Sequence, residues 1–128
     1  MKSGFLEVPR NEFVDYVVEL MSGWAPATAR RMFGGYGIYL EGLMFALIAD
    51  DQLYFKTDAV NEPQFERAGS QPFVYTSQTR TVQMSYWSAP EDSLESAAEI
   101  YNWCLSAYAA ALRAQAAKTG RSGKGKRK

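Results

Sequence analysis

The fold is decided by the stretch Leu43-Met-Phe-Ala-Leu-Ile-Ala49, seven apolar residues in succession. A strand that is apolar at consecutive positions must be covered on both faces, so we expect it inside a sheet, with helices over one face and a partner or bulky aromatic side chains over the other. Turn signals flank it, Glu41-Gly42 before and Asp50-Asp51 after. They predict antiparallel neighbours over Arg31–Leu40, a strand bent by its glycines, and over Leu53–Thr57.

Helices and a second hairpin are predicted around this meander. Apolar residues at helical spacing predict a helix over Pro9–Met21 and a short one over Asn61–Ala68. Alternation predicts a hairpin of Gln71–Thr76 and Thr81–Trp87. With a carboxy-terminal helix the order is α-β-β-β-α-β-β-α, and we expect a two-layer α+β fold with one five-stranded antiparallel sheet and helices on one face.

The carboxy-terminal part combines a long helix with a basic end. The capping-box spacing of Ser88-Ala-Pro-Glu91 predicts that the helix begins there, and we expect it to fray near Lys118. Residues 113–128 hold seven of the 14 basic residues and no acid, which leaves residues 1–112 with seven basic and 14 acidic residues. We therefore expect a domain over residues 1–115 and a disordered basic tail over residues 116–128.

Composition excludes most familiar catalytic sites. The chain has no histidine and a single cysteine, which rules out imidazole bases, Ser-His-Asp and Cys-His catalysis, Cys/His zinc sites and an internal disulfide. Asp50 and Asp51 are typical of a turn, and Cys104 lies in an apolar helical stripe without a cation within one turn, as a core residue would. We predict a protein that is not an enzyme and holds no metal or cofactor.

Neither a membrane span nor a leader is indicated. No run approaches the roughly 20 apolar residues of a membrane helix, and the first residues lack the apolar region of a signal peptide. We expect a cytoplasmic protein that does not contact membranes.

Two features invite a binding site. Gly34, Gly35 and Gly37 precede a strand, lack the third glycine of the dinucleotide fingerprint and include no P-loop lysine, so they indicate a bend or a close approach instead of phosphate binding. Arg30 and Arg31 stand beside aromatic residues. They are candidates for an anion or nucleic-acid contact, and equally for stacking on a ring or pairing with a carboxylate.

The basic tail has three open interpretations. It could contact phosphates nonspecifically, fold back on the acidic body, or serve only to keep the chain soluble. The candidate nucleic-acid contacts are Arg121, Lys124, Lys126, Arg127 and Lys128.

Four segments of the chain resemble the amino-terminal domain of the TfoX/Sxy family of competence regulators. They are Arg30–Asp50, Leu53–Asp58, Pro72–Tyr75 and Met84–Pro90, in the family's order. The resemblance implies a two-layer domain of the secretion-chaperone-like class, without known catalysis, in bacterial coactivators that act with the cyclic-AMP receptor protein. Full-length regulators continue into a helical carboxy-terminal domain, whereas this sequence continues into the basic tail.

The resemblance implies a regulatory interaction module. We expect it to bind a protein partner, such as the transcription machinery, while the tail contacts DNA. Two alternatives remain: a small-ligand protein whose pocket has converging polar groups, and a chaperone-like homodimer with a flat apolar patch and no nucleic-acid role. The candidate contacts for a partner or anion lie in the best-matched motif and are Arg30, Arg31, Met32, Phe33, Gly34, Gly35 and Tyr36.

Overall fold

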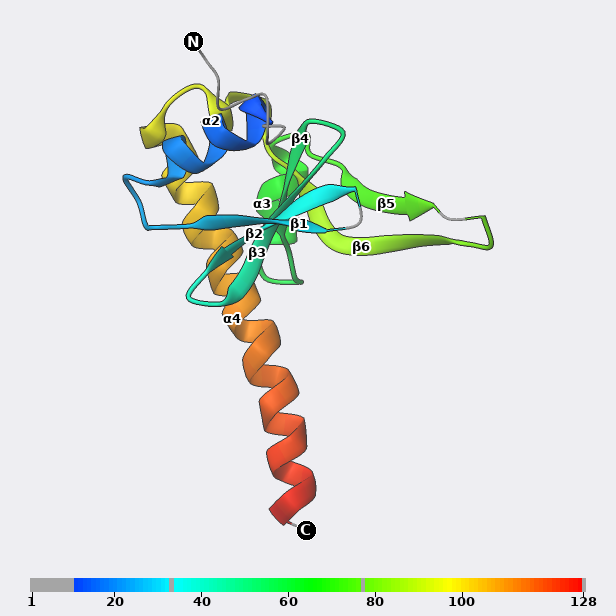
Figure 1. Cartoon of the computed structure of the whole chain (residues 1–128). Coiled ribbons are helices and arrows are strands. Elements are labelled where there is room, and N and C mark those ends of the chain that lie inside the picture. The colour runs from blue at the N-terminus through cyan, green and yellow to red at the C-terminus, as the bar shows by residue number, and fades with distance from the viewer. Residues whose placement is uncertain (1–10, 33, 77, 128) are drawn as a thin grey trace.

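The computed structural model describes residues 11–32, 34–76 and 78–127, the last eight of them without their side chains. It is an α+β fold built on one antiparallel sheet with the strand order β1-β2-β3-β4-β6-β5 (Figure 1). The elements are α2 (Glu12–Met21), β1 (Thr28–Met32), β2 (Gly35–Leu40), β3 (Leu43–Ala49), β4 (Gln52–Lys56), α3 (Glu62–Arg67), β5 (Pro72–Thr76), β6 (Thr81–Ser88), the 3-10 turn η1 (Glu91–Leu94) and α4 (Ala97–Arg127).

The prediction that β3 lies inside the sheet is confirmed, because β2 and β4 pair with it on either side. One core joins a face of the sheet to α2, α3 and α4, and β3 contributes Phe45, Ala46 and Ile48. Consecutive residues normally point to opposite faces. A register shift in the pairing of β2 with β3 leaves Phe45 without a partner, and this bulge lets Phe45 and Ala46 both enter the core. We call the sheet face turned away from this core the open face.

The predicted number of strands is wrong, because the sheet has six strands where five were expected. The stretch Arg31–Leu40 is not one bent strand: β1 and β2 form a hairpin in which Met32 pairs with Gly35. The two-residue connection includes Gly34, whose φ of 81° lies in the left-handed region that glycine adopts at little cost. The glycine that suggested a bend therefore makes a turn, and β1 begins at Thr28 in the predicted connector.

The predicted start of the long helix is also wrong. Ser88 ends β6, where it pairs with Tyr54 of β4. The 3-10 turn η1 follows, and α4 begins only at Ala97. The capping contact comes from Ser96, whose Oγ accepts a hydrogen bond from the Glu99 N–H at 3.2 Å. A second serine with the same spacing to a glutamate thus makes the cap that was predicted eight residues earlier.

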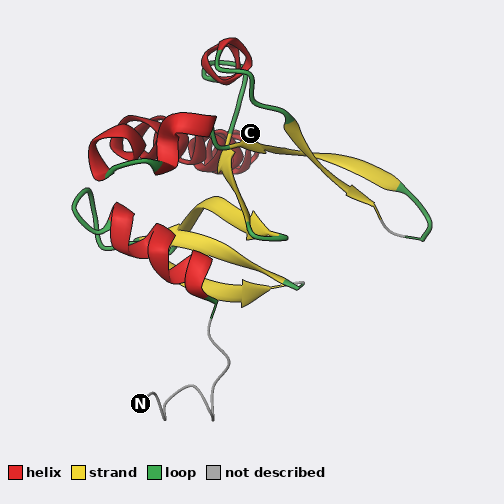
Figure 2. Ribbon diagram, turned by 90° about the horizontal axis from the view of Figure 1, so that it is seen from above, coloured by secondary structure: helices red, strands yellow, loops and turns green. Residues whose placement is uncertain are grey.

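The remaining elements agree with their predictions. Asn11 caps α2 by accepting a hydrogen bond from the Val14 N–H at 3.1 Å, and the first residues of the predicted helix lie outside the described residues. Helix α3 buries Phe65 completely. The second predicted hairpin is β5–β6, which projects beyond the other strands in Figure 2.

Helix α4 runs the length of the molecule and projects past the sheet (Figure 1). Its bounds reach Arg127, into the segment predicted to be a disordered tail, and the side chains of residues 120–128 lie outside the described residues. The division at residue 115 therefore stays a prediction. Among the described residues, no helix has the length and apolar character that crossing a membrane requires.

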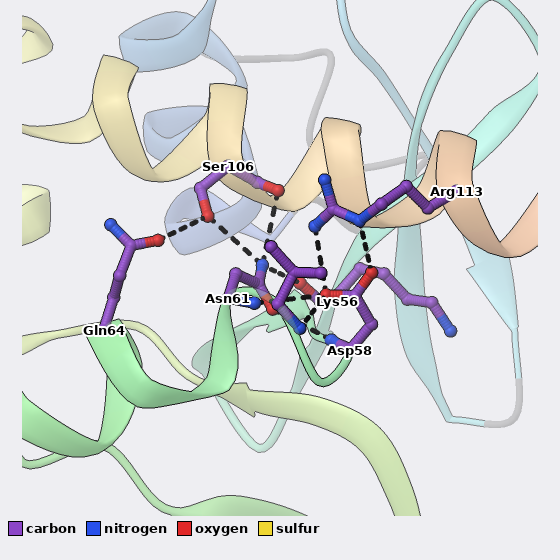
Figure 3. A network of polar contacts seen from close by, with 7 residues as sticks. Lys56, Asp58, Asn61, Gln64, Ser106 and Arg113 are labelled. Atoms are coloured by element: carbon purple, nitrogen blue, oxygen red, sulfur yellow. Dashed lines mark hydrogen bonds and ion pairs between the residues drawn. The ribbon is translucent and has the colours of Figure 1, made fainter.

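A polar network fastens α4 to the connection between β4 and α3 (Figure 3). The buried Asn61 accepts a hydrogen bond from the Asp58 N–H at 2.8 Å and donates to the carbonyl oxygens of Lys56 and Ser106 at 3.2 and 3.3 Å. About two turns further along α4, Arg113 donates to both carboxylate oxygens of Asp58 at 2.6 and 3.0 Å. These contacts fix where the middle of α4, at Ser106 and Arg113, lies relative to the end of β4.

Candidate interaction groove

The open face of the sheet carries a groove of about 500 Å³, here called the sheet groove. Its walls come from the β1–β2 hairpin, the end of β3 and the β5–β6 hairpin, which are far apart in the sequence. Leu47 forms part of the floor, because its neighbours Ala46 and Ile48 point into the core on the other face. The apolar side chains that line the groove include Met32, Leu47, Phe73, Val74 and Met84.

The motif singled out in the sequence supplies one wall of the sheet groove. Met32, Gly34, Gly35 and Tyr36 line it, whereas Phe33 lies outside the described residues. A side chain at position 35 would bring its Cβ against the backbone carbonyl oxygen of Ile48. Glycine at this position therefore lets β2 and β3 approach closely at the edge of the groove, which agrees with the structural interpretation of the glycines.

The two arginines of the motif lie outside the sheet groove and do not converge. The guanidinium carbon of Arg30 is 4.8 Å from the centre of the Tyr39 ring, and that of Arg31 is 5.9 Å from the Tyr36 ring. As adjacent residues of the edge strand β1, they point to opposite faces of the sheet. They therefore form no joint anion site, and each stacks on a ring, one of the two interpretations left open by the sequence.

The opposite wall was missed by sequence reasoning. Phe73 packs on Tyr54 with 4.6 Å between ring centres, while Val74, Tyr75 and Met84 are 48%, 49% and 36% exposed. Large apolar side chains at this exposure on a projecting hairpin are typical of an interaction surface. The available signal was the run of consecutive apolar residues in β5, which predicts cover on both faces, whereas Val74 and Tyr75 are exposed in the structure.

The polar residues of the region have structural roles. Asp50, at the rim of the sheet groove, and Asp51 have φ values of 52° and 56°, which confirms the predicted turn. Cys104 is completely buried, and burial raises the pKa of its thiol to about 12, so it is the core residue that was predicted. Among the described residues, no three of the types histidine, cysteine, aspartate and glutamate gather as metal ligands would.

Comparison with known proteins identifies the family. A model of the TfoX N-terminal domain matches residues 19–111, a range that contains every residue of the sheet groove. A similar curated relative is the DNA transformation protein TfoX1 of Aliivibrio fischeri (strain ATCC 700601 / ES114). It is 32% identical over 62 residues, which cover 48% of this chain and 30% of that relative. The match of the family model over most of the chain shows that the protein belongs to the TfoX N-terminal domain family.

Proposed function

We propose that the protein is a non-enzymatic regulatory module of the TfoX type that binds a protein partner through the sheet groove. The family is one of regulatory, competence-related proteins, and the relative's name refers to DNA transformation. The observation that carries the proposal is the origin of the groove walls. Many of the residues that line the groove belong to segments that carry the family resemblance: Met32, Gly34, Gly35, Tyr36, Phe73, Val74, Tyr75 and Met84.

The lining of the sheet groove favours a protein partner over a small polar ligand. A small-molecule site places a few polar groups so that they converge on the ligand. Here the walls are mainly apolar, and the exposed Val74 and Tyr75 extend the apolar surface along β5, an edge strand of the sheet. An edge strand also offers unpaired backbone groups to an extended segment of a partner. The partner we propose is a component of the bacterial transcription machinery in the cytoplasm.

Charged substitutions in the groove wall test this function. We expect Val74→Asp and Met84→Asp to abolish transcriptional output in the native cell and to abolish capture of the partner, because a carboxylate in an apolar interface is costly to desolvate. Val60→Asp is the matched control, since Val60 is 66% exposed and lies outside the sheet groove. All three variants should keep the melting temperature of the parent. Full transcriptional output from both groove variants would refute the proposal. If the variants instead lose binding of a small molecule and keep the protein partner, the small-ligand alternative is favoured.

The second part of the proposal assigns nonspecific DNA contact to the basic tail. Its support is the sequence, with five basic residues from Arg121 to Lys128 and no acid after Glu99. Five phosphate contacts would give log affinity a slope of about −4.5 against log salt, at about −0.9 for each contact. A chain that ends at Lys118 should lose most of this binding in fluorescence anisotropy on two unrelated duplexes. Unchanged affinity would show that the tail is not the DNA contact.

A further inference from the structure

Cations and tyrosines alternate across one end of the open face. Arg30 lies over Tyr39 at 4.8 Å, and the Lys56 ammonium lies 5.3 Å from the centre of the Tyr86 ring. Tyr39 pairs with Met44, and Lys56 pairs with Tyr86. Because Ala46 and Phe55 pair between β3 and β4, the register places all of these residues at the same end of the sheet.

Among the described residues Lys56 makes no ion pair with a carboxylate, although the charge of Asp58 favours its charged form. Its ammonium donates a hydrogen bond to the Ser85 hydroxyl at 2.7 Å, and Figure 3 shows it pointing away from Asp58. That carboxylate is already held by two hydrogen bonds from Arg113. Arg113 is one of the basic residues of the carboxy-terminal segment, but its ion pair with Asp58 gives it a structural role.

Lys118 is an exposed cation of α4, five residues after Arg113. The network around Asn61 and the Arg113–Asp58 pair hold α4 beside the end of β4. Burial lowers the pKa of Lys56, Asp58 opposes this shift, and the charge of Lys118 adds to it. An anion between or across these two ammonium groups would relieve the unfavourable effect of Lys118 on the charge of Lys56.

We infer that Arg30, Lys56 and Lys118, together called the basic row, form a phosphate-binding surface that continues the basic tail onto the body and takes the backbone of a nucleic acid. The inference rests on the proposed DNA contact of the tail and adds the body to it. Stacking on tyrosines orients Arg30 and Lys56 without cancelling their charge, which a carboxylate partner would do.

The dimensions of this surface suit a continuous polyanion. Three strand spacings of about 4.8 Å separate Arg30 on β1 from Lys56 on β4, about 14 Å across the sheet. Residues 118–127 of α4, which projects past the sheet in Figure 1, span about 14 Å at 1.5 Å per residue. Duplex DNA carries a charge every 1.7 Å or so along its axis, so it offers phosphates over either length, whereas an acidic peptide would need a matching run of carboxylates. We therefore assign the surface to a nucleic-acid backbone.

The test measures the salt dependence of duplex binding by the full chain. The basic-row variant is Arg30→Gln/Lys56→Gln/Lys118→Gln, and its binding is followed by fluorescence anisotropy between low and physiological salt. This variant cannot neutralise three of the phosphates, so the slope of log affinity against log salt should become shallower by about 2.7. If the affinity at 1 M salt is unchanged, the affinity at 0.1 M salt falls about 500-fold. The control Arg31→Gln/Arg67→Gln/Arg80→Gln removes the same charge elsewhere and should change the slope by less than the value for a single phosphate.

Each other outcome counts against a specific part of the inference. Equal slopes for the two triple variants would refute phosphate binding by the basic row. In that case, loss of binding on truncation after Lys118 would still support DNA contact by the tail. Absence of binding by the parent chain at low salt would refute both. Polyglutamate that competes as well as DNA at equal charge would refute the nucleic-acid assignment in favour of an acidic protein. If the triple variant does not fold, the single variant Lys118→Gln, at an exposed position of α4, must make the slope shallower by about 0.9.

Discussion

Phe45 is the residue whose truncation tests the core most directly. Its side chain is completely buried, and its ring meets Trp24 and Tyr108 edge-on with centre distances of 5.5 and 5.9 Å. Trp24 and Tyr108 also contact each other at 6.2 Å, so the three rings connect the sheet to α4 and to the segment after α2. Phe45→Ala would remove the central ring of this cluster.

The expected loss is about 4 kcal/mol in the free energy of unfolding. Truncation of a buried phenylalanine to alanine costs about 3–5 kcal/mol, including the cavity that remains. Two edge-to-face pairs, each worth about 0.5–1.5 kcal/mol beyond burial, put Phe45 in the upper half of that range. The remaining two rings already touch each other, so they have little freedom to collapse into the space.

Urea unfolding followed by tryptophan fluorescence measures this loss, since Trp24 lies against the substituted residue. With a denaturant slope of about 2 kcal/mol/M, the midpoint should fall by about 2 M. Val74→Ala, at an exposed position of the same sheet, should stay within about 0.5 kcal/mol of the parent. A loss below about 1 kcal/mol for Phe45→Ala would mean that the ring is not in a packed core, and the description of the fold would be wrong.

Three further predictions concern the polar network around Asn61 and the close approach of β2 and β3 at Gly35. Asn61→Ala should cost about 2–3 kcal/mol in urea unfolding, because it leaves the N–H of Asp58 and two carbonyl oxygens without their partner. The hydrogen bonds from Arg113 lower the pKa of Asp58. The ion pair therefore stabilises the fold above about pH 4, and this stabilisation is lost as the pH falls through the lowered pKa of Asp58. Asp58→Asn should remove it, and should lower the free energy of unfolding at neutral pH by at most about 1 kcal/mol, because the pair is partly exposed. A difference in stability between the variant and the parent that grows below pH 3 would contradict this prediction. Gly35→Ala should cost about 1–3 kcal/mol in thermal unfolding because its Cβ would press on the Ile48 carbonyl, and an unchanged melting temperature would show that β2 and β3 can separate there.

The sequence pattern predicted an element correctly where one property, such as an uninterrupted apolar run, determines it. The uninterrupted apolar character of β3 implied a strand inside the sheet with helices over one face, and the structure shows both. On the open face, Leu47 pairs with Tyr54, whose ring packs on Phe73. Where two local signals compete, the pattern could not decide. Gly34 fits both a bent strand and a tight turn, and only its positive φ, set by the pairing of β1 with β2, separates them.

Competition between signals also explains the misplaced helix start. Ser88 and Ser96 each stand three residues before a glutamate, so both fit a capping box. Ser88 is drawn into β6 by pairing with Tyr54, and its hydroxyl accepts a hydrogen bond from the Gln71 N–H at 3.0 Å. These are tertiary contacts with residues 17 and 34 positions away, which no local spacing reveals. The second wall of the sheet groove was missed for the same reason.

The segment Arg30–Asp50, which carries part of the family resemblance, contributes to the core on one face of the sheet and to the sheet groove on the other. Ile38 is completely buried in the core, while Met32, which belongs to the same hairpin, lines the sheet groove. Substitutions in this segment will therefore change both stability and the proposed partner binding, so regulatory output alone would not separate the two effects. Val74 and Met84 make no contribution to the core, so a charge at these positions changes the groove while leaving the packing intact. The proposed function is for that reason best tested at Val74 and Met84 of the β5–β6 hairpin, which also belong to segments that resemble the family.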